Sequence, residues 1–136
     1  MSTYADRIPR APADWGQDSI DEYREAQAEA RVTEQRFEAL AIANRYRSAV
    51  AREREEIASL LRPEAVERLA ELIETATDPA LLSGRILHYL GAIPYRGVYY
   101  ANRAISAAGI TDPRARIRDL DENERAALAV QVRRLA

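Results

Sequence analysis

The chain of 136 residues carries 20 basic side chains, and all 20 of them are arginines. A guanidinium group binds a phosphate through two parallel N–H donors, which an ammonium group cannot do. The same bias, together with alanine as the commonest residue, is also what a genome rich in G and C delivers. The positions of the arginines are therefore more informative than their number.

The charge is unevenly distributed along the chain, although the formal net charge is only −2. Residues 85–118 carry six arginines against one acid, Asp112, whereas residues 1–84 carry 11 arginines against 17 acids and residues 119–136 carry three against four. The total thus masks a basic window with a local charge of +5. Such a window predicts a phosphate-binding surface for nucleic acid, and the alternative is a solvated basic face without a partner.

The chain lacks the residues that several other kinds of chemistry require. The chain has no cysteine and a single histidine, His88, so disulfides, thiolate nucleophiles and zinc sites built from several of these residues are excluded. We expect His88 to be a partly buried structural residue, because its neighbours are apolar. No glycine-rich phosphate loop and no metal-ligand spacing is present. The sequence therefore predicts no enzyme, no cofactor and no small-molecule substrate.

Targeting signals are equally absent from the sequence. No window approaches about 18 consecutive apolar residues, and the N-terminus lacks an apolar signal core. We expect a cytoplasmic protein with no membrane partner, which the lack of cysteine fits.

The composition predicts an all-α protein, because Ala, Arg, Glu and Leu are abundant and only 5 Gly and 6 Pro are present. Residues 1–17 are expected to form a disordered tail. Residues 18–61 predict a long helix or arm, either one helix or two with a bend, with a narrow apolar stripe in its first half. Residues 62–136 predict a small helical domain.

Helix breakers and caps divide the expected domain into four helices and no strand. Their expected bounds are 63–75, 78–91, 98–109 and 121 onward. Gly109 is expected to end the third of these helices in the left-handed conformation, with apolar Ile110 packing back on it. Asp121 and Glu124 have the spacing of a capping box at the start of the last helix.

Several short motifs follow one another in order and spacing from about Ala49 to the end. They are residues 52–57, 78–81, 93–101, 109–110, 114–120 and 125–128. This order resembles the actinobacterial integration host factor family of nucleoid-associated proteins. The resemblance covers roughly two-thirds of the chain and rests on the order of the motifs, since no single motif is specific. The end of the chain also resembles the helix-two-turn-helix segment of a ribosomal small-subunit protein.

The resemblance implies a helix-two-turn-helix domain that holds duplex DNA at its phosphate backbone. One implied contact is the turn at Arg96, Gly97, Val98 and Tyr100, and a second is the arginine-rich turn that follows. The family usually has lysine where this chain has Tyr95, Val98 and Tyr100, so this contact is expected to be weaker here. Tyrosine hydroxyls could donate to phosphate instead, or the rings could simply pack.

The N-terminal helix adds a further DNA contact in this family, although its arginines could equally form ion pairs along a solvated helix. The expected DNA-binding residues are Arg45, Arg52, Arg54, Arg96, Gly97, Val98, Tyr100, Arg103, Arg114, Arg116 and Arg118.

Together these observations predict a sequence-tolerant, double-stranded-DNA-binding architectural protein, associated with the nucleoid and of bacterial or phage origin. The main alternative is a helical protein-interaction or dimerisation module that uses residues 18–61 and has lost its DNA affinity. RNA binding is a third, weaker interpretation.

Overall fold

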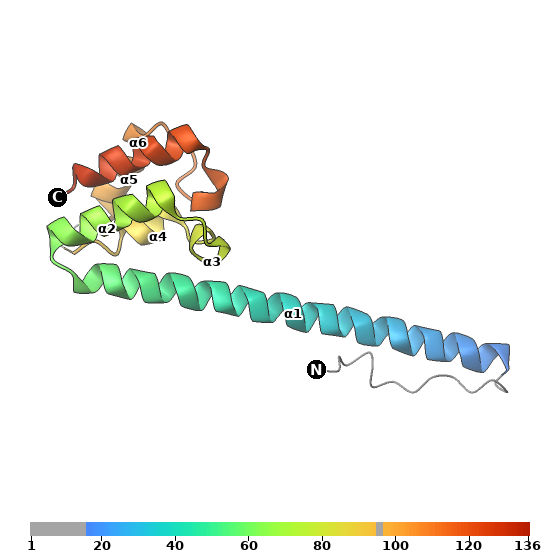
Figure 1. Cartoon of the computed structure of the whole chain (residues 1–136). Coiled ribbons are helices and arrows are strands. Elements are labelled where there is room, and N and C mark those ends of the chain that lie inside the picture. The colour runs from blue at the N-terminus through green and yellow to red at the C-terminus, as the bar shows by residue number, and fades with distance from the viewer. Residues whose placement is uncertain (1–15, 95–96) are drawn as a thin grey trace. The chain divides into compact units, whose positions relative to one another are not determined.

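The structure, a computed structural model, describes residues 16–94 and 97–136 (Figure 1). Within these ranges the chain is helical, with no sheet, and a long N-terminal helix is followed by shorter ones, which confirms the expected all-α fold. Residues 1–15 of the expected tail lie outside the described residues. The elements are α1 (Gln17–Ser59), α2 (Arg62–Thr75), α3 (Pro79–Leu82), α4 (Ile86–Leu90), α5 (Val98–Ala107), the 3₁₀ helix η2 (Ile117–Asp119) and α6 (Glu122–Arg133).

Helix α1 is one continuous helix, which resolves the choice that the sequence left open between one helix and two. By their packing the residues divide into two compact units, 1–44 and 45–136. In the first unit, the N-terminal part of α1 leaves four of its large apolar side chains exposed. These side chains are Val32, Phe37, Leu40 and Ile42.

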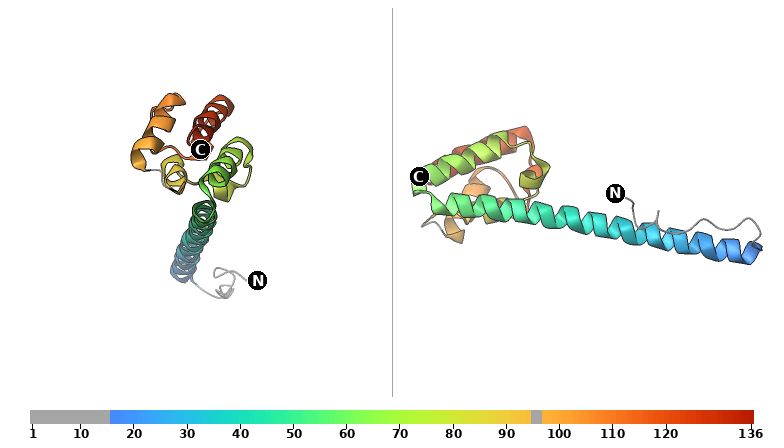
Figure 2. Two further views of the ribbon diagram at one scale, coloured as in Figure 1. Left: turned by 90° about the vertical axis from the view of Figure 1, so that its left-hand side faces the viewer. Right: turned by 60° about the horizontal axis from the view of Figure 1, so that its bottom comes forward.

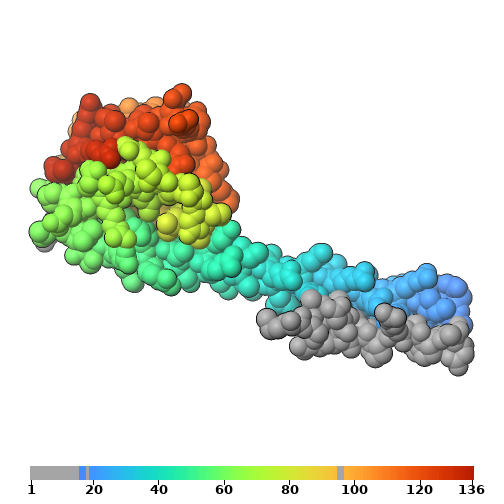
Figure 3. Space-filling model, in the orientation of Figure 1, coloured from blue at the N-terminus to red at the C-terminus, as the bar shows by residue number. Residues whose placement is uncertain are grey.

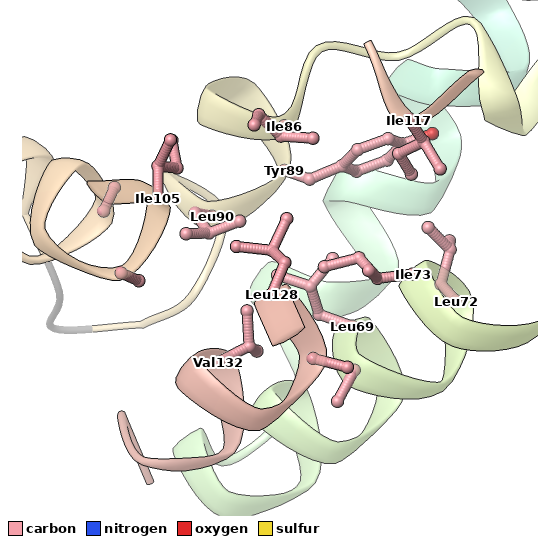
Figure 4. Close-up of a cluster of buried hydrophobic side chains, with 14 of the residues drawn as sticks. Leu69, Leu72, Ile73, Ile86, Tyr89, Leu90, Ile105, Ile117, Leu128 and Val132 are labelled. Carbon is pink, nitrogen blue, oxygen red and sulfur yellow. The ribbon is translucent and has the colours of Figure 1, made fainter. Parts of the chain in front are cut away.

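The second unit has one hydrophobic core, to which all of its helices contribute. Figure 4 shows Leu69 and Ile73 of α2 facing Leu128 of α6 across this core, with Tyr89 of α4 and Ile117 of η2 beside them. All five of these side chains are fully buried. Burial of this apolar area is the main favourable contribution to folding.

The helices of the second unit pack in the order α2, α6, α5 and α4, each against the next (Figure 2). The surfaces of α2 and α6 meet along their length (Figure 3). Arg133 of α6 forms ion pairs there with Glu67 and Glu74 of α2. The Arg133 Nε and Nη2 atoms donate to the two carboxylate oxygens of Glu67, each at 3.1 Å. This bidentate hydrogen bond to the Arg133 guanidinium lowers the pKa of Glu67 below its usual value.

Acid is therefore expected to weaken the contact between α2 and α6. Because the pKa of Glu67 is lower in the folded chain, the stabilisation by this pair is present above the unfolded pKa of about 4.3 and is lost as the pH falls through the folded pKa. Replacing Glu67 by Gln should cause a small loss of thermal stability at pH 7 that vanishes near pH 3. The check is thermal unfolding across this pH range. Glu71→Gln on the same helix is the control, and an equal loss in both variants would contradict the expectation.

Two helix ends confirm expectations from the sequence. Gly109 has a φ of +81°, and the Ile110 N–H donates to the Ile105 carbonyl at 3.2 Å, as in a Schellman motif with its apolar residue buried. At the start of α6, the Glu124 N–H donates to Asp121 Oδ1 at 2.7 Å and the Asp121 N–H donates to Glu124 Oε1 at 3.0 Å. This is the expected capping box.

The single helix expected over 78–91 is wrong, because the chain forms α3 and α4 with a break at Ser83, Gly84 and Arg85. A Cβ atom on Gly84 would lie 2.4 Å from Cε2 of the buried Tyr89 ring, so the backbone passes the ring at a distance that only glycine allows. The Tyr89 hydroxyl donates to the Leu81 carbonyl at 2.8 Å, which fixes the ring beneath the break. Burial raises the pKa of Tyr89 above its usual value, so this hydroxyl stays a donor.

Candidate nucleic-acid interface

The arginine-rich turn alternates basic and apolar side chains over residues 114–118. Ala115 and Ile117 are buried, at 8% and 0% exposure, and Ile117 is part of the core. Arg116, between these two buried residues, has extended backbone, whereas Arg118 lies in the 3₁₀ helix η2. Arg114 and Arg118 are exposed, as expected from the sequence.

The break before α4 pairs with this turn and brings in a further arginine. The Ile86 N–H donates to the Ala115 carbonyl and the Ile117 N–H donates to the Gly84 carbonyl, each at 3.1 Å. These bonds make an isolated antiparallel bridge between Arg85 and Arg116. Arg85, Arg114, Arg116 and Arg118 together are called the basic ridge below.

Arg85 is missing from the residues expected to bind DNA, although it lies in the basic window. Its local sequence could have indicated it, since Arg85–Ile86 repeats the pattern of Arg116–Ile117, with an arginine before a buried isoleucine. The pairing of the two segments depends on a break in the expected helix, which the periodicity of residues 78–91 did not reveal.

Arg116 also supports the fold of the ridge. Its Nη1 atom donates to the Ser83 carbonyl at 2.8 Å, and its backbone N–H donates to Asp119 Oδ2 at 2.9 Å. The side chain is half-buried, whereas Arg85, Arg114 and Arg118 are exposed. Arg116 therefore holds the two segments of the ridge together, and its substitution would change the fold as well as the charge.

The three exposed ridge arginines have no carboxylate partner in the part of the chain that the structure describes. The nearby acids act on the backbone instead, because Asp112 accepts from the Arg114 N–H at 2.9 Å and Asp119 accepts from the Arg116 N–H. Clustered cations that are not neutralised within the chain produce a local positive potential that attracts anions.

The start of α5 holds a second group of expected site residues. Gly97 precedes the helix with extended backbone and no side-chain cap, so the first N–H groups of α5 have no side-chain acceptor there. A Cβ on Gly97 would meet nothing within 4 Å. Val98, Tyr100 and Arg103 are all exposed. Arg96, which was expected to contribute here, lies outside the described residues.

The arginines expected on α1 have different environments. Arg52 is exposed, and the Arg45 guanidinium lies over the Tyr46 ring at 5.8 Å from its centroid. The Arg54 Nε atom donates to the His88 carbonyl at 3.1 Å, at the C-terminal end of α4. Arg54 therefore connects α1 to α4 within the second unit. His88 itself is exposed, which corrects the expectation that it is partly buried.

Other arginines outside the expected set have structural partners. Arg68 of α2 forms ion pairs with Glu53 and Glu56 of α1, and these bonds raise its pKa. Arg125 of α6 donates to the carbonyls of Ile73 and Ala76 at the end of α2, each at 2.7 Å. These contacts distinguish arginines that hold parts of the fold together from Arg85, Arg114 and Arg118 of the ridge, which are exposed.

Searches against protein-family models, curated proteins and solved structures find no match for this chain. In residues 16–94 and 97–136, no helix combines the length and apolar character needed to cross a membrane. The same residues contain no group of three or more His, Asp or Glu side chains arranged to hold a metal ion.

Proposed function

We propose that this protein binds double-stranded DNA through phosphate contacts, with little sequence preference, and that it has an architectural rather than a catalytic role. The observation that carries the proposal is the basic ridge, where three exposed arginines lie on two paired segments of the backbone, without carboxylate partners among the described residues. The formal charge of the whole chain is only −2. Arginines of this kind are the usual ligands of DNA phosphates.

The geometry of the ridge suggests how such binding would proceed. Arg85, Arg114 and Arg118 would each donate to backbone phosphates, while Arg116 keeps the two paired segments in register. The uncapped N–H groups after Gly97 are donors of the kind that accept a phosphate at a helix start. These donors come from turns and a helix end rather than from a long helix that could enter the major groove, which favours backbone contacts over base reading.

The same proposal makes the chain a nucleoid-associated protein of the integration host factor type. Its support is the order of motifs over residues 49–136. This chain has Tyr95, Val98 and Tyr100 where that family usually has lysine, so the proposal assigns most of the phosphate binding to the ridge. Any preference for particular sites would arise from DNA shape and deformability.

The experiment that tests the proposal is an anisotropy titration of the full chain with two unrelated duplexes of about 25 bp and with a duplex RNA of the same length. We expect micromolar binding to both DNA duplexes at low salt, with affinities within about threefold of each other. A large difference between the two DNA sequences would contradict sequence tolerance. Tighter binding to RNA would favour the RNA interpretation instead.

A second candidate function is protein interaction through the N-terminal part of α1. The observation that favours it is the exposure of Phe37 and Leu40, at 66% and 53%, which lie three residues apart and therefore share one face of the helix. Exposed apolar clusters commonly mark interaction surfaces.

If this surface joins two copies, replacing Phe37 and Leu40 together by Glu should convert a dimer to a monomer in sedimentation equilibrium, because charge at both positions would have to be desolvated in the interface. Replacing Arg31 and Arg36 of the same helix by Ala is the control for surface substitution. A wild-type chain that is monomeric at about 100 μM would reject self-association. If the wild type instead captures another protein and the double Glu variant does not, the surface binds that protein rather than a second copy of the chain.

A further inference from the structure

Helix α5 exposes large apolar and aromatic side chains at its start that are not needed for the hydrophobic core. Its buried positions are Ala101, Ala104 and Ile105, at 2%, 5% and 2% exposure. Its first turn instead exposes three large side chains, Val98 at 65%, Tyr99 at 66% and Tyr100 at 41%. Because stabilisation by apolar side chains depends on their burial, these three contribute little to the core.

The exposed side chains form an ordered cluster. The Tyr99 and Tyr100 rings meet edge to face, with centroids 5.5 Å apart and an interplanar angle of 78°. The Arg103 guanidinium lies over the Tyr99 ring at 5.8 Å from its centroid, one helical turn further on. Val98, Tyr99, Tyr100 and Arg103 together are called the aromatic patch.

The charge around the patch indicates what kind of partner would cover it. Helix α5 has no acidic residue, and the window of residues 85–118 that contains it has six arginines against one acid. A partner must therefore offer negative charge and flat apolar faces at the same place. Nucleic-acid bases next to their own phosphates offer both, and stacking of bases on aromatic and arginine side chains is a common mode of recognition.

In an intact duplex the flat faces of the bases are covered by their neighbours. A kink or a short gap exposes them, and apolar side chains can then insert at the opened step. The patch, with an apolar Val98 beside an aromatic Tyr99, has the composition of such a wedge.

Resting on the DNA-binding function proposed above, we propose that the aromatic patch stacks on bases exposed at a kink or gap, so that the protein prefers distorted to intact duplex DNA. Tyr99 supplies the stacking ring, and Arg103 supports the ring and adds a cation. The ridge supplies the sequence-independent affinity in both kinds of DNA.

The test compares full-length wild type with Tyr99→Ala and Tyr99→Phe on two DNAs, an intact duplex of about 25 bp and the same duplex with a central two-nucleotide gap. Wild type should bind the gapped DNA roughly tenfold more tightly. Tyr99→Ala should reduce that preference to about twofold or less, with unchanged affinity for the intact duplex. Tyr99→Phe should keep the preference, because stacking needs the ring and not the hydroxyl. Circular dichroism and thermal unfolding confirm that both variants fold.

Each other outcome overturns the inference in a recognisable way. Equal affinity of wild type for both DNAs rejects the stacking role and leaves phosphate binding intact. A full preference in Tyr99→Ala assigns the effect to other residues, and a loss in Tyr99→Phe equal to that in Tyr99→Ala assigns it to a hydroxyl–phosphate hydrogen bond. Failure of wild type to bind either DNA at low salt rejects the DNA-binding function and this inference together.

Discussion

Replacing Arg114 and Arg118 together by alanine should weaken binding to an intact duplex about 60-fold at 0.1 M salt. Each lost phosphate contact is expected to reduce the slope of log K against log salt by about 0.9, which corresponds to roughly eightfold in affinity at this salt concentration. Both side chains are exposed and have no carboxylate partner in the described parts of the chain, so the fold should not depend on them. The loss should be the same on every duplex sequence, because phosphates are common to all of them.

Two further variants show whether a loss of affinity comes from the local charge of the ridge, from the total charge of the chain or from a change in folding. Arg31→Ala combined with Arg36→Ala removes the same charge from exposed positions of α1, and it should change affinity by less than about threefold. Arg116→Ala should weaken binding and also lower thermal stability, since its guanidinium hydrogen-bonds the Ser83 carbonyl. Equal losses in the ridge variant and in the α1 control would remove the ridge from the binding site.

Replacing Gly84 by alanine should destabilise the second unit by about 3 kcal/mol, a fall in Tm of roughly 10–20 °C. The new methyl group would lie 2.4 Å from the Tyr89 ring, which is fully buried and has its hydroxyl bonded to the Leu81 carbonyl. The ring cannot retreat without disturbing the core. The Gly84 carbonyl also accepts from the Ile117 N–H, so the strain would reach the ridge directly.

Gly97→Ala is the matched control for this substitution. A Cβ on Gly97 has open space around it, and the extended backbone there suits alanine, so its effect on stability should stay below about 1 kcal/mol. Urea unfolding of both variants measures the difference. A Gly84→Ala variant as stable as Gly97→Ala would show that the turn before α4 is looser than the structure has it.

Local sequence signals predicted much of the fold. The end of α5 at Gly109 and the start of α6 at Asp121 follow from rules that involve only a few neighbouring residues. The structure confirms both. The long helix α1 follows from an uninterrupted stretch without Pro or Gly. The break at Gly84 did not follow, because its cause is the Tyr89 ring and a pairing with residues about 30 positions later in the chain. Helical periodicity carries no information about such a tertiary contact.

The sequence also predicted part of the candidate site. The alternation of arginine with apolar residues over 114–118 was visible in the sequence, and in the structure Arg114 and Arg118 are exposed whereas Arg116 is half-buried. The structural bond of Arg116 and the position of Arg85 beside it depend on the bridge between distant segments. Arg54, expected either to contact DNA or to form an ion pair along its helix, instead binds the His88 carbonyl. The sequence shows where the charged residues are, but only the packing shows which of them already bind other groups of the same chain.

The measurement that tests the central claim most directly is the salt dependence of binding between the full chain and an intact duplex of about 25 bp, from 0.05 to 0.2 M salt. Three exposed ridge arginines, each contributing about 0.9, predict a slope of log K against log salt of about −2.7 or steeper. Absence of binding at the lowest salt, or a slope near zero, would contradict a function based on phosphate contacts.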